Sequence, residues 1–193
     1  MLLHEIILIA IGLGLEIFAI VVCKGAVFSK IHKKTLFQLI AIFATWQLVT
    51  VIIGNLLVGM LHFTLSDSNE SGKFLLQVLS IIIFGVIAMR MLFLAHKNED
   101  VIESREDSIK VNNILQISAI VGLNGLVAGV GFGFMETSMI HQLIVLLSVS
   151  VLAVIIGIYV GYNYGYRPKT RGYLLGGLIL LVTDVVLCIR YFN

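Results

Sequence analysis

The fold of this chain is decided by the stretch IILIAIGLGLEIFAIVV, which occupies residues 6–22. The stretch is long and apolar enough to cross a bilayer as a helix, for which about 20 residues are needed. Its one charged residue, Glu16, lies near the middle, where a carboxylate costs about 2.5–3.5 kcal/mol on insertion scales. Such a residue normally faces a polar partner, a wet cavity or a bound cation, so Glu16 is the first candidate for a functional residue.

The composition of the whole chain indicates a polytopic membrane protein. Of its 193 residues 59% are hydrophobic and only 12% are charged, and the mean hydropathy is +1.06. A soluble domain carries about 25% charged residues. The N-terminus lacks the basic region and the cleavage site of a secretory signal, so we expect the first apolar stretch to be retained as a span. We therefore predict one membrane domain over residues 1–193 that contacts the lipid bilayer and no nucleic acid.

Six segments of the chain are long enough to span a membrane as helices. None shows the alternation of apolar and polar residues that a membrane β-barrel strand would need. The predicted fold class is therefore an all-α integral membrane protein with six transmembrane helices. The expected spans are 4–23, 35–62, 74–95, 112–134, 140–163 and 172–191.

The basic residues predict the orientation of these spans. Ten of them fall in three connections on one side, whereas only Lys73 and Arg190 fall on the other. Because basic residues are retained on the cytoplasmic side, both termini are expected outside. The ten are Lys24, Lys30, Lys33, Lys34, Lys97, Arg105, Lys110, Arg167, Lys169 and Arg171.

Three further features have simple expected roles. Arg90 lies near the cytoplasmic end of the third span, so its side chain is expected to snorkel toward the interface. Cys23 and Cys188 are isolated and are expected to be free thiols. The longest connection, 97–111, is strongly charged and is expected to be a solvated linker.

This linker divides the chain into a first three-helix repeat, 1–96, and a second, 112–193. Because each half has an odd number of spans, the two halves enter the membrane in opposite senses, which predicts two inverted three-helix repeats. In such proteins the binding site often lies near the midplane, between the repeats.

Short stretches of similar sequence in the two halves, called echoes below, support the repeat. They align Glu16 in the first span with Asn124 in the fourth. Glycines recur at every fourth residue in spans four and five, a spacing that allows helix backbones to approach closely. The echoes are 15–20 with 123–128, 51–54 with 154–157, and Gly85 with 176–177, and the glycines are Gly125, Gly129, Gly133, Gly157, Gly161 and Gly165.

Four polar residues inside the spans are the candidate ligands of a transported ion: Glu16, Gln47, Asn124 and Asp184. Carboxylate and amide oxygens suit hard divalent cations such as Mn²⁺, Mg²⁺ or Ca²⁺. Each residue also has a structural alternative. Glu16 could be a protonated acid bonded to another helix, and Asn124 or Gln47 a hydrogen-bonding group between helices. Asp184 could pair with Arg90.

No motif indicates an enzyme. The spans hold no His or Cys cluster at zinc spacing, and the chain has no Walker, GxSxG or HExxH pattern. We therefore expect no catalytic residue and no cofactor, with a cation as substrate rather than as a resident group.

At these residues the chain resembles the MntP-type manganese exporters, small six-span proteins of the bacterial inner membrane. The family's first-span pattern M-D-A-F-A-A-S-x-x-K-G-A is similar to LEIFAIVVCKGA at residues 15–26, and its fourth-span pattern L-D-A-M-A-V-G-x-G to LNGLVAGVG at 123–131. Its sixth-span L-G-G is matched at 175–177. The resemblance implies divalent-cation export, most simply of Mn²⁺, from a bacterial cell.

The chain departs from this family at the residues that carry charge. Family members typically have aspartate at the positions of Glu16 and Asn124 and an acid at that of Gln47. The largest negative charge of these three positions falls from three to one, which weakens the attraction for a divalent cation. Asp184, which is not part of the family pattern, could restore one charge.

Two other functions are compatible with the same residues. A site with fewer charges could carry a monovalent cation or a small neutral or zwitterionic solute. The chain could also be a membrane protein that binds a partner and transports nothing. Exchange of the cation for a proton at Glu16, and assembly into a homo-oligomer, are further hypotheses.

Overall fold

The computed structural model describes residues 3–28, 31–65, 70–96, 111–135 and 138–192. Within these ranges the chain forms six α-helices and no strand, which confirms the predicted all-helical class. The helices are α1 (Leu3–Val27), α2 (Lys33–Leu65), α3 (Glu70–His96), α4 (Val111–Phe134), α5 (Met139–Tyr164) and α6 (Pro168–Phe192).

Each helix contains the whole of its predicted span and extends beyond it by one to four residues at one end or both. Five are long and apolar enough to cross a membrane, while the described apolar part of α4, Val121–Phe134, is shorter. The protein is therefore a multi-pass membrane protein. α2 has 33 residues, or about 50 Å of helix at 1.5 Å per residue, so it tilts or emerges beyond a core of about 30 Å.

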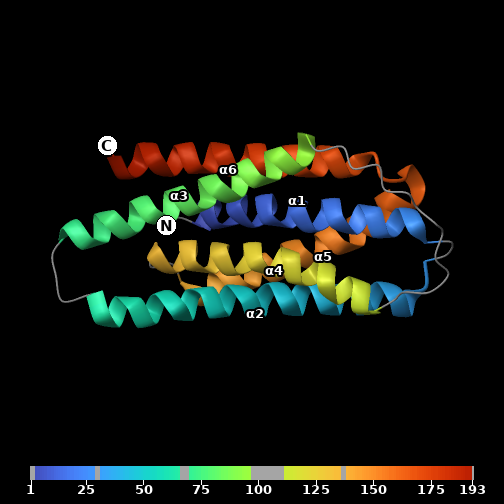
Figure 1. The fold of residues 1–193 in the computed structure, drawn as a ribbon, viewed down its shortest axis with the longest axis horizontal. Helices are drawn as coiled ribbons and strands as arrows, with labels where there is room; N and C mark the ends of the chain where they lie inside the picture. Colours follow the sequence, from blue (N-terminus) through green and yellow to red (C-terminus); the bar gives the residue numbers. More distant parts are fainter. Residues whose placement is uncertain (1–2, 29–30, 66–69, 97–110, 136–137, 193) are drawn as a thin grey trace.

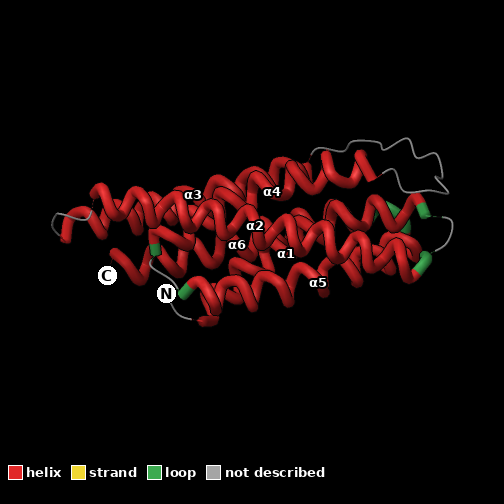
Figure 2. The backbone as a smooth tube through the Cα atoms, turned by 90° about the horizontal axis from the view of Figure 1, so that it is seen from below, coloured by secondary structure: helices red, strands yellow, loops and turns green. Residues whose placement is uncertain are grey.

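The six helices run lengthwise, side by side, from one end of the bundle toward the other (Figures 1 and 2). α1 lies inside the bundle and packs mainly against α5 and α6. α2 packs chiefly against α4, and α3 against α6. The central position of α1 explains how a span with a glutamate at its middle is accommodated, because its polar side chain can face other helices instead of lipid.

Apolar side chains fill the bundle and also cover its outside. Ile9, Leu13 and Ile17 of α1 are almost completely buried, whereas Phe93 and Ile140 are about 70% exposed. Exposed apolar side chains on this scale would be unfavourable in water. They are the surface that contacts the lipid bilayer.

Glycines bring two pairs of helices into backbone contact. A Cβ on Gly161 of α5 would lie 2.1 Å from the Val22 carbonyl oxygen of α1. A Cβ on Gly54 of α2 would lie 2.2 Å from the Leu126 carbonyl oxygen of α4. The prediction of close packing is confirmed at these interfaces.

Gly165 does not belong to this packing pattern, so its predicted role was wrong. A Cβ at this position would meet nothing within 4 Å. Gly165 instead ends α5 with a φ of 71°, and its N–H donates to the Gly161 carbonyl at 2.8 Å. A positive φ favours glycine, which has no Cβ to clash.

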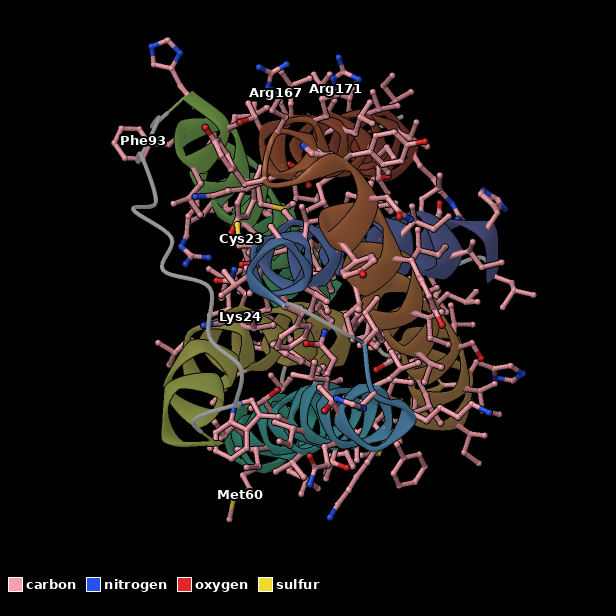
Figure 3. All side chains as sticks on the ribbon, turned by 90° about the vertical axis from the view of Figure 1, so that its right-hand side faces the viewer. Cys23, Lys24, Met60, Phe93, Arg167 and Arg171 are labelled. Carbon is pink, nitrogen blue, oxygen red and sulfur yellow. The ribbon has the colours of Figure 1, made fainter. Side chains whose placement is uncertain are left out.

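One end of the bundle carries most of the basic residues that the structure describes. The ends of α1, α3 and α5 and the starts of α2, α4 and α6 lie there, opposite the two termini (Figure 1). Figure 3 looks onto this end, where Arg167 and Arg171 project from the edge of the bundle. The linker predicted at 97–111 lies outside the described residues except for Val111. Cys23 and Cys188 form no disulfide, as predicted.

Candidate functional site

Glu16 is buried at the middle of α1. Its side chain is only 2% exposed, although a carboxylate is among the groups least often buried without a partner. The helices around α1 enclose it. The insertion cost predicted for this residue is therefore met by contacts inside the protein.

Two nitrogen donors converge on one oxygen of this carboxylate. Arg90 of α3 donates from Nη1 to Glu16 Oε1 at 3.0 Å, and Asn124 of α4 donates from Nδ2 to the same atom. The contacts join α1, α3 and α4. A buried carboxylate with a charged and a neutral donor has the partners that burial demands. In this arrangement the charges of Glu16 and Arg90 cancel.

The prediction that Arg90 snorkels was wrong. Its guanidinium points inward to Glu16, while 36% of its side chain remains exposed. Two opposite charges attract each other far more strongly in a low-dielectric interior than they do in water. The buried carboxylate therefore holds Arg90 more effectively than the interface would.

Gln47 of α2 lies beside this cluster. A Cβ on Gly125, the neighbour of Asn124, would be 3.2 Å from Gln47 Oε1 and 2.5 Å from Thr50 Oγ1. Thr50 donates within its own helix, at 2.9 Å to the Trp46 carbonyl and 3.0 Å to that of Gln47. Gln47 Oε1 is buried and has no hydrogen-bond partner. A buried acceptor without a donor is unfavourable, so this oxygen is free to bind a cation or a donor.

Asp184 lies elsewhere, on the interface of α6 with α3. Its Oδ2 would be 2.9 Å from a Cβ on Gly85, and its Oδ1 is buried without a hydrogen-bond partner. The suggested pair of Asp184 with Arg90 was wrong, because Arg90 pairs with Glu16. The structure thus brings Glu16 and Asn124 into contact and places Gln47 against α4 next to Asn124, whereas Asp184 lies on another interface.

A second buried acid on α1 was missed in the sequence. Glu5 is 1% exposed and accepts a bond from Arg190 Nη1 of α6 at 2.8 Å. Glu5 lies about three helical turns before Glu16 and therefore on the same face of α1. This spacing of two acids was the available signal.

Another pair of polar residues was also missed. Asn55 of α2 donates to Gln142 of α5 at 2.9 Å. Both residues lie in spans, where a hydrogen bond between helices satisfies amide groups that lipid cannot.

The oxygen atoms available around α4 at this depth come from one carboxylate, Glu16, and from the amides of Asn124 and Gln47. Within the residues that the structure describes, no three His, Cys, Asp or Glu side chains cluster. Oxygen ligands of this kind suit hard cations. Because Arg90 and Asn124 both donate to Oε1, a cation that binds this oxygen has to displace them.

Comparison with known proteins places the chain among annotated relatives over most of its length. The family model described as "Putative manganese efflux pump" matches residues 30–187. A protein named as such a pump in Clostridium botulinum strain Loch Maree is 27% identical, covering 98% of this chain and 95% of the relative. One from Mannheimia succiniciproducens is 25% identical, covering 94% and 93%. No solved structure matches the chain.

Proposed function

Since the chain belongs to the manganese efflux pump family, we propose that it exports a divalent cation, most simply Mn²⁺, through the region around Glu16. The observation that carries this proposal is the buried Glu16 carboxylate at the middle of α1, with the Asn124 amide of α4 bonded to it and the Gln47 amide of α2 packed on α4 beside Asn124. An acid inside a membrane bundle is a common mark of an ion pathway.

In the proposed site Glu16 is the charged ligand, and Gln47 and Asn124 supply neutral oxygens. The unpartnered Oε1 of Gln47 supports its role, because no protein donor competes for that atom. Asn124 would turn its amide so that oxygen replaces nitrogen on the side of the cation. Asp184, with its own unpartnered oxygen, is proposed as an auxiliary acid away from the site.

Matching contacts in the two halves support an inverted repeat. If Glu16 corresponds to Asn124, then Phe18 corresponds to Leu126. A Cβ on Gly54 would meet the Leu126 carbonyl, and a Cβ on its counterpart Gly157 would meet the Phe18 carbonyl, at 3.1 Å. The helix pairs match in the same way. In the repeat α1 corresponds to α4 and α5 to α2, and α1 packs on α5 as α4 packs on α2. Rocking of one repeat against the other would then expose the site to each side in turn.

The proposed orientation puts the basic end of the bundle in the cytoplasm of a bacterium and both termini outside the inner membrane. Lys24, Arg167 and Arg171 all lie at that end (Figure 3), as the retention of basic residues predicts. A cation leaving the cell would enter the bundle from this end.

The test is cellular manganese in a bacterium that lacks its own exporter and expresses this chain. The native protein should lower manganese, and Glu16→Gln should abolish the effect. Glu5→Gln is the matched control, because it neutralises a second buried acid on the same face of α1. A native chain that leaves manganese unchanged contradicts the proposal.

A restored variant, Glu16→Asp with Gln47→Glu and Asn124→Asp, belongs in the same experiment. If only this variant lowers manganese, the fold is that of an exporter and the native site serves another solute.

A second candidate function is transport of a monovalent cation or a small neutral solute. The observation that favours it is the Arg90–Glu16 pair, which leaves the region without net charge. Isothermal titration of the purified protein with Mn²⁺, Mg²⁺, Ca²⁺, Na⁺ and K⁺ separates the two. Heat of binding with a monovalent ion alone would favour the second candidate.

A further inference from the structure

The guanidinium of Arg90 occupies the position that a cation would take at Glu16. Its Nη1 lies 3.0 Å from Oε1, the same oxygen that accepts the Asn124 bond. A divalent cation at this oxygen would face a positive charge at close range in a low-dielectric interior, where the repulsion is strong. The two cations therefore exclude each other.

The two members of the pair differ in their freedom to leave. The Glu16 side chain is 2% exposed, whereas that of Arg90 is 36% exposed. Arg90 lies six residues before the end of α3 at His96, about 9 Å along the helix axis. A long arginine side chain near a helix end can extend toward the interface. The guanidinium can thus reach the polar interface at the end of α3, whereas the Glu16 carboxylate cannot leave the interior.

We propose that Arg90 is a tethered counter-cation, which occupies Glu16 when no metal is bound and withdraws toward the basic end of the bundle when the metal binds. This inference rests on the proposed function, because it specifies how the binding region of that transporter is occupied between cycles. Arg90 is accordingly a positioning residue and not a ligand.

The exchange explains how the empty protein keeps its acid inside the bundle. An unpaired buried carboxylate is strongly unfavourable. As the guanidinium returns to Oε1 it displaces the metal, and the region is neutral again. The transporter can then change conformation without an uncompensated charge.

The chain contains a matched control for a purely structural ion pair. Arg190 binds Glu5 at 2.8 Å, with side-chain exposures of 41% and 1%. Both pairs join a buried acid of α1 to a partly exposed arginine of another helix. Loss of either arginine should weaken folding, and only loss of Arg90 should alter metal binding.

The experiment measures Mn²⁺ binding to the full chain in lipid nanodiscs, from the free Mn²⁺ signal in electron paramagnetic resonance. Working at pH 8 reduces proton competition for the carboxylate. If Arg90 blocks nine in ten empty molecules or more, Arg90→Gln should bind Mn²⁺ about tenfold or more tightly than the native chain. Arg90→Lys should fall between them, Arg190→Gln should match the native chain, and Glu16→Gln should bind none.

Manganese export in cells provides the second measurement. Arg90→Gln should export less than the native chain although it binds more tightly, because nothing displaces the metal from Glu16. A merely structural role would lower binding and export together.

Two results separate the failure of this inference from the failure of the proposed function. If the native chain binds Mn²⁺ through Glu16 and folded Arg90→Gln binds it no more tightly, the proposed role of Arg90 is refuted and the proposed transport function stands. If no variant binds Mn²⁺, the proposed function fails and the inference with it. Should Arg90→Gln not fold, Arg90→Lys decides, and an affinity equal to that of the native chain refutes the inference.

Discussion

Replacing Asn124 by aspartate tests the reasoning about the Glu16 region most directly. The Nδ2 group that now donates to Glu16 would become a carboxylate oxygen. Two like charges about 4 Å apart repel by about 4 kcal/mol at an effective dielectric constant of 20. The lost bond to a charged acceptor removes about 1.5–3 kcal/mol more. Arg90 offsets part of this, and protonation of one acid limits the rest. We therefore expect the metal-free variant to be less stable by on the order of 3 kcal/mol.

The same change should strengthen metal binding. Two carboxylates in place of one raise the attraction for a divalent cation. At a concentration of 100 times the dissociation constant, Mn²⁺ would stabilise the folded state by about 2.7 kcal/mol. The assay is thermal unfolding in nanodiscs, with and without Mn²⁺. Asn124→Asp should melt below the native chain without metal and show the larger upward shift with it.

Asn55→Asp is the control for this experiment. Asn55 donates to Gln142 at 2.9 Å, so this variant also replaces a donating amide by an acid, but its partner is an amide oxygen and not the Glu16 carboxylate. It should lose stability without recovery by Mn²⁺. The reasoning is refuted if metal-free Asn124→Asp is as stable as the native chain, or if Mn²⁺ shifts both proteins equally.

Three further results are expected from unfolding of the purified protein. Gly161→Ala should destabilise the protein by about 2–3 kcal/mol, because the new methyl group would lie 2.1 Å from a backbone carbonyl oxygen. Gly59→Ala is the control and should be nearly neutral, because its methyl group would meet nothing within 4 Å. Equal effects of the two changes would contradict the packing at Gly161. Ser80→Ala removes a buried 2.7 Å bond to a carbonyl of α4 and should cost about 1 kcal/mol, and no change in unfolding would show that this bond contributes nothing. Arg190→Gln should cost about 2 kcal/mol by leaving Glu5 without its charged partner, and a native melting temperature would contradict that expectation.

The elements of the fold could be predicted from the sequence because hydropathy acts locally. Each apolar stretch has to form a helix in lipid, where no water satisfies the backbone. The close contacts of α5 on α1 and of α4 on α2 were likewise visible as glycines at every fourth residue. Gly165 shows the limit of that pattern, since the same spacing ends in a helix cap and not in a contact.

The partners inside the bundle could not be predicted, because they depend on how six helices are rotated against one another. Glu16 and Asn124 were aligned by the sequence echo, and they do meet. Arg90 looked like an interfacial residue, since hydropathy reports its depth along α3 and not the direction of its side chain. For the same reason the position of Asp184 in its span did not show that it packs against Gly85 of α3.

The order of synthesis gives the buried acids of α1 a consequence for biogenesis. α1 leaves the ribosome before the other five helices, yet Arg90 and Asn124 follow Glu16 by 74 and 108 residues, and Arg190 follows Glu5 by 185 residues. The nascent helix must enter the bilayer before Arg90, Asn124 and Arg190 are made, and its long apolar stretches must outweigh the cost of its acids. Arg190 lies in α6, so the ion pair of Glu5 closes only after the other five helices have been made. A chain cut short before α6 would lack this ion pair between α1 and α6.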